Sequence, residues 1–289
     1  MFDVQAMAKT YKENGYVIFE RLLSESERLA ALCGFHRLFA PSYESWVEQG
    51  RPEIAHNFAP GNHNFPWDDS GLNHSSAHPK LSALVEAVMG TREFRFGLCH
   101  LNVKYAQAMD RDSMVKSFGF HQDHASNSLG PTLEFDDYSH VVGTYCFEEV
   151  TVGTAPTMVI PKGRDESAAL PMTAPAGSLI LYSPLTFHRA SSFENETGYK
   201  PSMWMTFCRK DHLWDGSFQY TKRVMDANAS IRYMSEATPR QLELIGFPSP
   251  GDPLWTEDFL NGMADRYPGF KKEPYLKKLM ADPHFATKS

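Results

Sequence analysis

Gly119-Phe120-His121-Gln122-Asp123-His124 and, later in the chain, Phe187-His188-Arg189-Ala190 are the stretches that decide how this sequence is interpreted. His121 and Asp123 stand two positions apart, so both side chains point to the same face of an extended segment. His188 follows a short apolar run that predicts a second strand ending there. Two imidazoles and one carboxylate form the facial triad that holds Fe(II) and leaves coordination positions open. The pattern therefore predicts a non-haem iron oxygenase in which His121, Asp123 and His188 are the catalytic, metal-binding residues.

Length and composition favour a globular enzyme. The chain has 289 residues, 42% of them hydrophobic, so it can bury a sizeable core, and we expect a single domain over residues 1–289. The net charge is −7 and no run of Lys or Arg exceeds two residues, so we expect no nucleic-acid partner. Neither a signal sequence nor a membrane span is predicted, because no apolar run approaches 18 residues. The four cysteines form no CxxC pair, which favours free thiols and a cytoplasmic location.

Helices and one strand are expected in the N-terminal part, residues 1–93. A Ser followed three residues later by Glu is a capping box, and it starts a helix after Ser24. Residues 41–80 lack a clean period and are rich in Asn, His, Pro and Gly, so we expect an irregular binding loop there. The predicted elements are a helix over 3–15, a strand over 16–19, a helix from Ser24 to about Phe39, and a helix that follows His78-Pro79-Lys80 and runs to about Met89.

Short alternating segments separated by Gly and Pro predict a β-rich core over residues 94–210. Between Phe96 and Tyr105 one face is apolar, and the other carries Leu98, His100, Asn102 and Lys104. The other predicted strands cover residues 117–123, 141–148, 157–160, 178–182 and 201–210. Many short strands favour a jelly roll, so the predicted fold class is mainly β with flanking helices. Residues 211–289 predict a helical extension, with helix starts at Thr238 and Thr256.

A cation is expected near the metal if the cosubstrate is a 2-oxoacid with a second carboxylate. Lys200 lies on the strand after His188 and supplies that charge, with Arg209 as the alternative. Strand alternation places Ser202 and Trp204 on the same face as Lys200. We therefore expect Lys200 and Ser202 to bind the cosubstrate.

These segments give the chain a resemblance to the phytanoyl-CoA dioxygenase-like (PhyH) family of Fe(II)/2-oxoglutarate-dependent oxygenases. The resemblance covers most of residues 10–210 and is carried by Asn14–Phe19, His121–Asp123, Val159–Arg164, Ala176–Leu181 and His188. It implies a double-stranded β-helix (cupin-like) core, iron on the three predicted ligands, and conversion of 2-oxoglutarate and O₂ to succinate and CO₂. It also implies that Gln122 and Lys104 contact 2-oxoglutarate. Lys200 departs from the Arg that the family usually has, and Lys offers a point charge rather than a bidentate fork.

Two other functions stay open on the residues alone. One is a cupin-type metal enzyme that does not use 2-oxoglutarate, and the other is a non-enzymatic jelly-roll binding module. A second metal site is a further possibility, but the spacing fits no ligand template, so a loop with surface histidines is favoured. The histidines concerned are His56, His63, His74 and His78.

The substrate is expected to be a small organic molecule or natural product. Asp123 leaves no room for a halide, so hydroxylation, desaturation or another oxidative outcome is expected rather than halogenation, and hydroxylation is favoured. We expect residues 56–75 and 209–220 to flank it, and Trp204 and Asn102 to contact it. The aromatic segments near the C-terminus are expected either to line the substrate or to form a homodimer interface.

Overall fold

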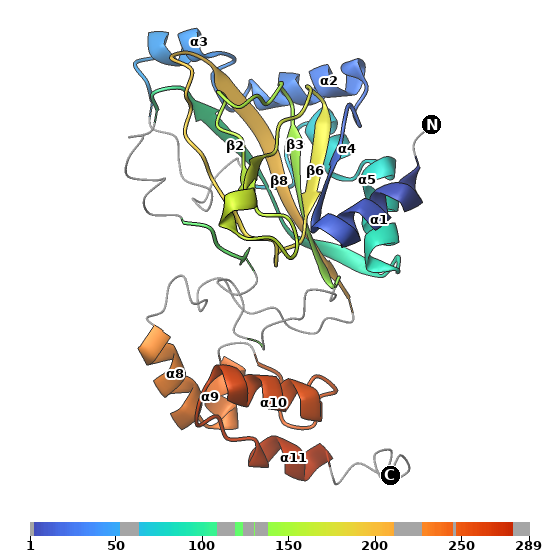
Figure 1. Ribbon diagram of the computed structural model, residues 1–289, viewed down its shortest axis with the longest axis vertical. Helices are drawn as coiled ribbons and strands as arrows, with labels where there is room; N and C mark the ends of the chain where they lie inside the picture. Colours follow the sequence, from blue (N-terminus) through green and yellow to red (C-terminus); the bar gives the residue numbers. More distant parts are fainter. Residues whose placement is uncertain are drawn as a thin grey trace. The chain divides into compact units, whose positions relative to one another are not determined.

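The computed structural model describes residues 3–52, 64–108, 119–123, 130, 138–210, 227–244 and 247–279. The chain divides into two compact units. The first contains residues 3–121 and 138–210, and the second is formed chiefly by the C-terminal residues 227–279 (Figure 1). Each unit has its own hydrophobic core.

Two antiparallel sheets form the centre of the first unit. The larger sheet has the strand order β1-β6-β3-β8-β2, and the smaller has the order β5-β4-β7. The larger sheet consists of β1 (Tyr16–Phe19), β2 (Phe94–Tyr105), β3 (His140–Cys146), β6 (Ser178–Tyr182) and β8 (Tyr199–Arg209). The smaller sheet consists of β4 (Met158–Val159), β5 (Leu170–Pro171) and β7 (His188–Arg189), and a 3₁₀ turn, η1 (Glu166–Ala168), precedes β5. The predicted double-stranded β-helix with flanking helices is confirmed.

Helices lie along one face of the larger sheet, as Figure 1 shows for α1, α2, α4 and α5. Their bounds are α1 (Val4–Asn14), α2 (Glu25–Phe35), α3 (Tyr43–Glu48), α4 (Ser70–Ser76) and α5 (Pro79–Met89). The predicted capping box starts α2, because the Glu27 amide donates to Ser24 Oγ (3.3 Å) and the Ser24 amide donates to Glu27 Oε2 (2.8 Å). Gly15 ends α1 with a φ of 80°, a left-handed conformation that glycine adopts without strain.

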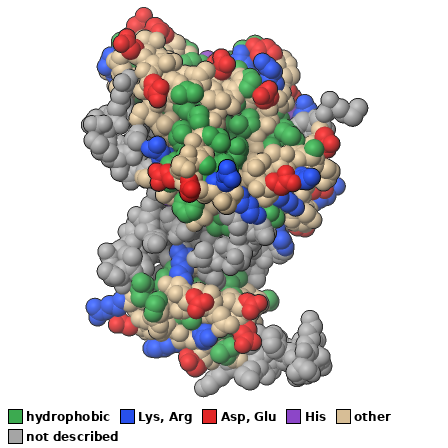
Figure 2. Space-filling view, viewed as in Figure 1, with side chains coloured by type: hydrophobic (Ala, Val, Ile, Leu, Met, Phe, Trp, Pro, Cys, Tyr) green, Lys and Arg blue, Asp and Glu red, His purple; other side chains and the backbone are tan. Residues whose placement is uncertain are grey.

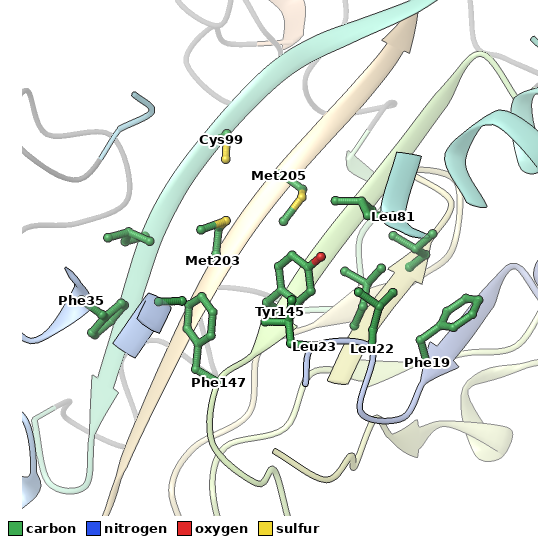
Figure 3. Close-up of a cluster of buried hydrophobic side chains, with 14 of the residues drawn as sticks. Phe19, Leu22, Leu23, Phe35, Leu81, Cys99, Tyr145, Phe147, Met203 and Met205 are labelled. Atoms are coloured by element: carbon green, nitrogen blue, oxygen red, sulfur yellow. The ribbon is translucent and has the colours of Figure 1, made fainter. Parts of the chain in front are cut away.

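The two faces of the larger sheet pack against different partners, as the alternation in β2 predicted. Its apolar face is buried against the helices, and Figure 3 shows Cys99 on β2 near Met203 and Met205 on β8 in this core. The opposite face of β3 and β6 packs against the smaller sheet, where Val142 and Ile180 share a cluster with Val159. The polar residues of β2 therefore lie on the face that is turned toward the smaller sheet.

Several predicted boundaries were wrong. Helix α2 ends at Phe35, because the Arg37 and Leu38 amides donate to carbonyls only three residues back and so tighten the chain into turns. Residues 41–80 contain two short helices, α3 and α4. Side chains of Ser42 and Asp69 cap them, accepting from the Ser45 and Leu72 amides respectively.

The histidine-bearing strands also differ from the prediction. His188 does not end the strand that precedes it but lies on a separate short strand, β7. Residues 117 and 118 of the predicted 117–123 strand lie outside the described residues, and His121 forms a single bridge rather than a ladder. Strand β5 was not predicted, since two residues are too few to show a period.

The second unit contains four helices in its described part, namely α8 (Ala227–Glu236), α9 (Pro239–Leu244), α10 (Glu257–Arg266) and α11 (Glu273–Leu279). The predicted starts of α9 and α10 are confirmed, and Thr256 caps α10 by accepting from the Phe259 amide (3.1 Å). Trp255 is fully buried, with its ring centroid 4.0 Å from that of Tyr275. The C-terminal aromatic residues of this cluster are therefore used in the core of their own unit.

Three further properties concern the described residues of both units. Acidic and basic side chains are interspersed over the face shown in Figure 2, around a group of hydrophobic side chains that lies over the sheets. Within the described ranges no helix combines the length and apolar character needed to cross a membrane. The cysteines are free thiols; Cys99, Cys146 and Cys208 are buried and Cys33 is exposed.

Candidate metal centre and cosubstrate site

The backbone brings His121 and His188 together directly. They are antiparallel bridge partners, and each amide donates to the carbonyl of the other at 3.0 Å. Directly opposed residues of such a pair project to the same side of the two strands, and the two imidazole centroids lie 4.6 Å apart. Residues far apart in the sequence therefore present their ring nitrogens to one point.

Asp123 completes this group. The carboxylate and the ring nitrogens of His121 and His188 offer one ligand atom each, and all three atoms lie within 4.8 Å of one another. His188 is buried, whereas His121 and Asp123 are half-buried. This is the donor set of a facial triad, which leaves coordination positions of the metal open to other ligands.

Hydrogen bonds behind the two rings fix which nitrogen faces the metal position. His121 Nδ1 lies 3.0 Å from the Gly119 carbonyl oxygen, and His188 Nδ1 lies 2.9 Å from that of Thr186. A carbonyl oxygen can only accept, so each Nδ1 carries the hydrogen and each Nε2 keeps its lone pair. Metal-binding histidines are usually held in this way. The residues present thus fit a divalent metal in ligand type, spacing and tautomer.

A second group with metal-like composition is formed by Glu27, His74 and His78, whose ligand atoms also lie within 4.8 Å of one another. Here the tautomer is the opposite one. The Lys80 amide donates to His78 Nδ1 (3.2 Å), so the hydrogen of the neutral ring is on Nε2, which donates to Glu27 Oε1 (3.3 Å). This group therefore links two helices by a hydrogen bond, because His78 caps the start of α5 and Glu27 lies on α2. His56 and His63 of the histidine-rich loop lie outside the described residues.

Lys104 and Lys200 occupy directly opposed positions on β2 and β8. Both belong to the face turned toward the smaller sheet, and the Lys200 ammonium donates to the Ala155 carbonyl oxygen (2.5 Å). Burial and the neighbouring Lys200 charge lower the pKa of Lys104 to about 7, and burial lowers the pKa of Lys200. Neither lysine has an ion-pair partner among the residues whose positions are described. Two cations side by side, Lys200 buried and Lys104 half-buried, form a site suited to an anion.

The other residues predicted to bind the cosubstrate are Ser202, on the same strand as Lys200, and Gln122. Ser202 is buried opposite Asn102, and its hydroxyl donates to the Asn102 carbonyl oxygen (3.1 Å). Gln122 lies between the two triad residues of its segment, and its contact with 2-oxoglutarate stays a prediction. Arg209, the predicted alternative to Lys200, lies at the far end of β8, about 30 Å along an extended strand, and alternation puts it on the helix-facing side.

A chain of aromatic side chains connects the metal position to the predicted substrate residue Trp204. Trp204 Nε1 donates to the Tyr182 hydroxyl (3.2 Å), and the Tyr182 ring lies 4.7 Å from the ring of His188. His100 faces Trp204 across the strand pair at 5.0 Å. Sequence reasoning assigned no role in the site to Tyr182 or His100, although alternation places His100 on the face of β2 with Asn102 and Lys104, and Tyr182 on the face of β6 that packs against the smaller sheet.

Comparison with known proteins gives a family and a fold. Residues 11–198 match the family described as phytanoyl-CoA dioxygenase (PhyH). A comparison with the curated proteins gives no match. Among solved structures, SnoK, a non-haem α-ketoglutarate-dependent carbocyclase from nogalamycin biosynthesis, is 15% identical, with 71% of this chain and 83% of that chain covered and a TM-score of 0.50.

Two other solved structures show a similar degree of likeness. A nickel complex of the non-haem monooxygenase ThoJ is 17% identical. The match covers 70% of this chain and 77% of that chain, with a TM-score of 0.51. EctD from S. alaskensis with 2-oxoglutarate and 5-hydroxyectoine is 14% identical. The match covers 74% of this chain and 78% of that chain, with a TM-score of 0.54. At these identities the likeness concerns the fold.

Proposed function

Because the chain belongs to the phytanoyl-CoA dioxygenase family of Fe(II)/2-oxoglutarate-dependent oxygenases, we propose that it hydroxylates a small organic molecule at the His121, Asp123 and His188 centre. Each turnover would convert substrate, 2-oxoglutarate and O₂ into hydroxylated product, succinate and CO₂. Family membership disfavours the two alternatives, a metal enzyme without 2-oxoglutarate and a non-enzymatic binding module.

The single observation that carries the proposal is the geometry of the triad. His121 and His188 would hold Fe(II) through Nε2, and Asp123 would hold it through a carboxylate oxygen. When bound, the iron supplies the activation of O₂ and the oxidation of the substrate. The protein's part is orientation, since the Gly119 and Thr186 carbonyls keep both rings in the tautomer that a metal requires.

Lys200 and Lys104 would bind the far carboxylate of 2-oxoglutarate. Their register brings two ammonium groups to one position on the sheet, and a carboxylate would relieve the repulsion between them. The Ser202 hydroxyl lies one inward-facing position further along β8, and it would contact this carboxylate by turning its hydrogen away from the Asn102 carbonyl oxygen. Lysine in place of the usual family Arg changes the geometry from a planar fork to two separate point charges.

The substrate would lie beside Trp204 and Asn102, with His100 and Tyr182 as further neighbours on the same face. We expect a free acid, an amino acid derivative or a natural-product scaffold rather than a coenzyme A thioester, since a net charge of −7 does not favour binding of a polyphosphate. Of the two segments predicted to flank the substrate, residues 56–75 and 209–220, the parts 56–63 and 211–220 lie outside the described residues, and the role of both segments stays a prediction.

Metal titration of three variants tests the proposal. Purified protein freed of metal should bind one Fe(II) or Mn(II) per chain by calorimetry, and Asp123→Ala and His188→Ala should abolish this binding. His74→Ala is the matched control, because His74 belongs to the other Glu/His cluster and should leave the stoichiometry at one. The wild-type protein with Fe(II), ascorbate and 2-oxoglutarate should release succinate, and Lys200→Met should not at the same cosubstrate concentration. The assignment would be contradicted if Asp123→Ala bound the metal with wild-type affinity, or if Asp123→Ala released succinate without bound iron.

A further inference from the structure

Phe120 and Arg189 are the chain neighbours of the two predicted histidine ligands. Because His121 pairs with His188 in an antiparallel bridge, Phe120 stands opposite Arg189. Neighbouring residues of a strand project to opposite faces, so this pair lies on the reverse side of the bridge from the two imidazoles. The same two backbone segments thus carry a ligand pair on one side and an aromatic–cation pair on the other.

The Arg189 guanidinium is positioned for a cation–π interaction. Its Cζ lies 4.9 Å from the centroid of the Phe120 ring. Its Nε is buried and has no hydrogen-bond partner within the part of the chain that the structure describes. A guanidinium that has lost water without gaining a hydrogen bond at this nitrogen interacts more strongly with a ring face than an exposed one does.

This contact lies where the backbone offers little other support. The described residues join the segment 119–123 to β7 through one bridge, with its two reciprocal hydrogen bonds. On its other side β7 is only two residues long and pairs with β4, where Arg189 is opposite Met158. A cross-strand side-chain contact adjacent to a single bridge adds a restraint on register and twist that the bridge alone does not give.

We propose that Arg189 and Phe120 form a clasp that holds the two histidine-bearing segments together and so sets the affinity of the metal centre. Both are positioning residues, since neither would touch the metal or the substrate. The inference rests on the proposed function, in which His121 and His188 bind the metal. It adds that metal affinity depends on a contact on the opposite side of the bridge.

The test is a double-mutant cycle read out by metal binding. Mn(II) affinity of the metal-free protein would be measured by calorimetry for Arg189→Met, Phe120→Leu and the double variant. Each single substitution should weaken binding by about tenfold, at the lower end of the range for outer contacts of metal ligands, because the pair is adjacent to the ligands in the chain and does not touch the metal. The double variant should be no weaker than either single one by more than about twofold, since both remove the same contact. Arg189→Lys keeps a cation and should recover part of the affinity.

Three controls separate the clasp from other causes. Arg164→Met removes an exposed arginine close to β4 in the sequence and should leave Mn(II) affinity unchanged. The melting temperature of the metal-free variants should stay near that of the wild type, and the Co(II) absorption spectrum of Arg189→Met should change in shape. Affinity for 2-oxoglutarate at saturating Mn(II) should be unaltered, because the lysine pair is not part of the clasp.

The possible outcomes distinguish this inference from the proposed function. Wild-type Mn(II) affinity in Arg189→Met and Phe120→Leu, together with lost affinity in Asp123→Ala, would overturn the clasp and keep the metal centre. Additive losses in the double variant would also overturn it, because independent effects are not a shared contact. Unchanged affinity in Asp123→Ala would instead remove the proposed function itself.

Discussion

At the scale of single residues, Lys104 bears two electrostatic costs, burial and the like charge of Lys200. The pKa of Lys104 falls from an ordinary value of 10.5 to about 7 for these reasons. The free site therefore releases a proton as the pH rises through 7, whereas a bound carboxylate would restore the charge. An anion that binds at this lysine pair would therefore be accompanied by proton uptake at Lys104.

Affinity for 2-oxoglutarate should consequently weaken as the pH rises. One linked proton with a free-state pKa near 7 predicts a loss of about tenfold between about pH 6 and pH 8, which calorimetry of the Mn(II)-loaded protein can measure. Buffers with different ionisation enthalpies should report the proton uptake directly. Lys104→Met should bind more weakly and lose the pH dependence, while Lys9→Met, at an exposed position of α1, should behave as the wild type. Equal affinities at both pH values in the wild type would contradict the linkage.

The residue types and the face of the candidate site could be predicted from the sequence, but its hydrogen-bonding state could not. Alternation placed Lys104, Asn102 and Ser202 on one face, and the structure agrees. By contrast, the opposite tautomers of His188 and His78 depend on whether a carbonyl or an amide lies behind the ring. Those partners are set by turns of the folded backbone, which no residue pattern displays.

At the scale of the elements, the start of helix α2 could be predicted from the sequence because a side chain, that of Ser24, caps it. Ser24→Ala should lower the free energy of unfolding by about 1 kcal/mol, because the Glu27 amide would lose the partner that caps helix α2. Chemical denaturation measures this change. Ser82→Ala, within α5, is the matched control and should be neutral or slightly stabilising, since alanine is the better helix former. A larger loss in Ser82→Ala than in Ser24→Ala would show that the cap is not the source of the effect.

Element length explains which parts of the fold were predicted. The long strands β2 and β8 show enough alternation to be found, and the helices α1 and α5 have a glycine at their C-terminal ends. Strands β4, β5 and β7 have two residues each, so they exist only through the partners that pair with them. For that reason the position of His188 on its own strand could not be derived from periodicity.

At the scale of the whole molecule, the two units have separate cores with different characters. The first is built from aliphatic, aromatic and sulfur-containing residues between sheet and helices, as Figure 3 shows around Met203 and Met205. The second is a small helical core centred on Trp255, which contacts Phe247, Phe270 and Tyr275. Separate cores allow each unit to lose structure without the other. The expectation of a single domain over residues 1–289 stays a prediction that this behaviour can test.

Trp255→Ala should therefore unfold the second unit selectively. Removing a fully buried indole costs about 3–5 kcal/mol, which is comparable to the stability that so small a core can supply. Hydrogen exchange should lose protection in peptides from α8 to α11, while β2 and β8 stay protected and Mn(II) affinity stays that of the wild type. Trp255→Phe, which keeps a buried ring, should retain most of the protection. Loss of protection in β2 and β8 to the same extent would instead mean that both cores unfold together as one cooperative domain, because cooperative unfolding requires that neither core is stable alone.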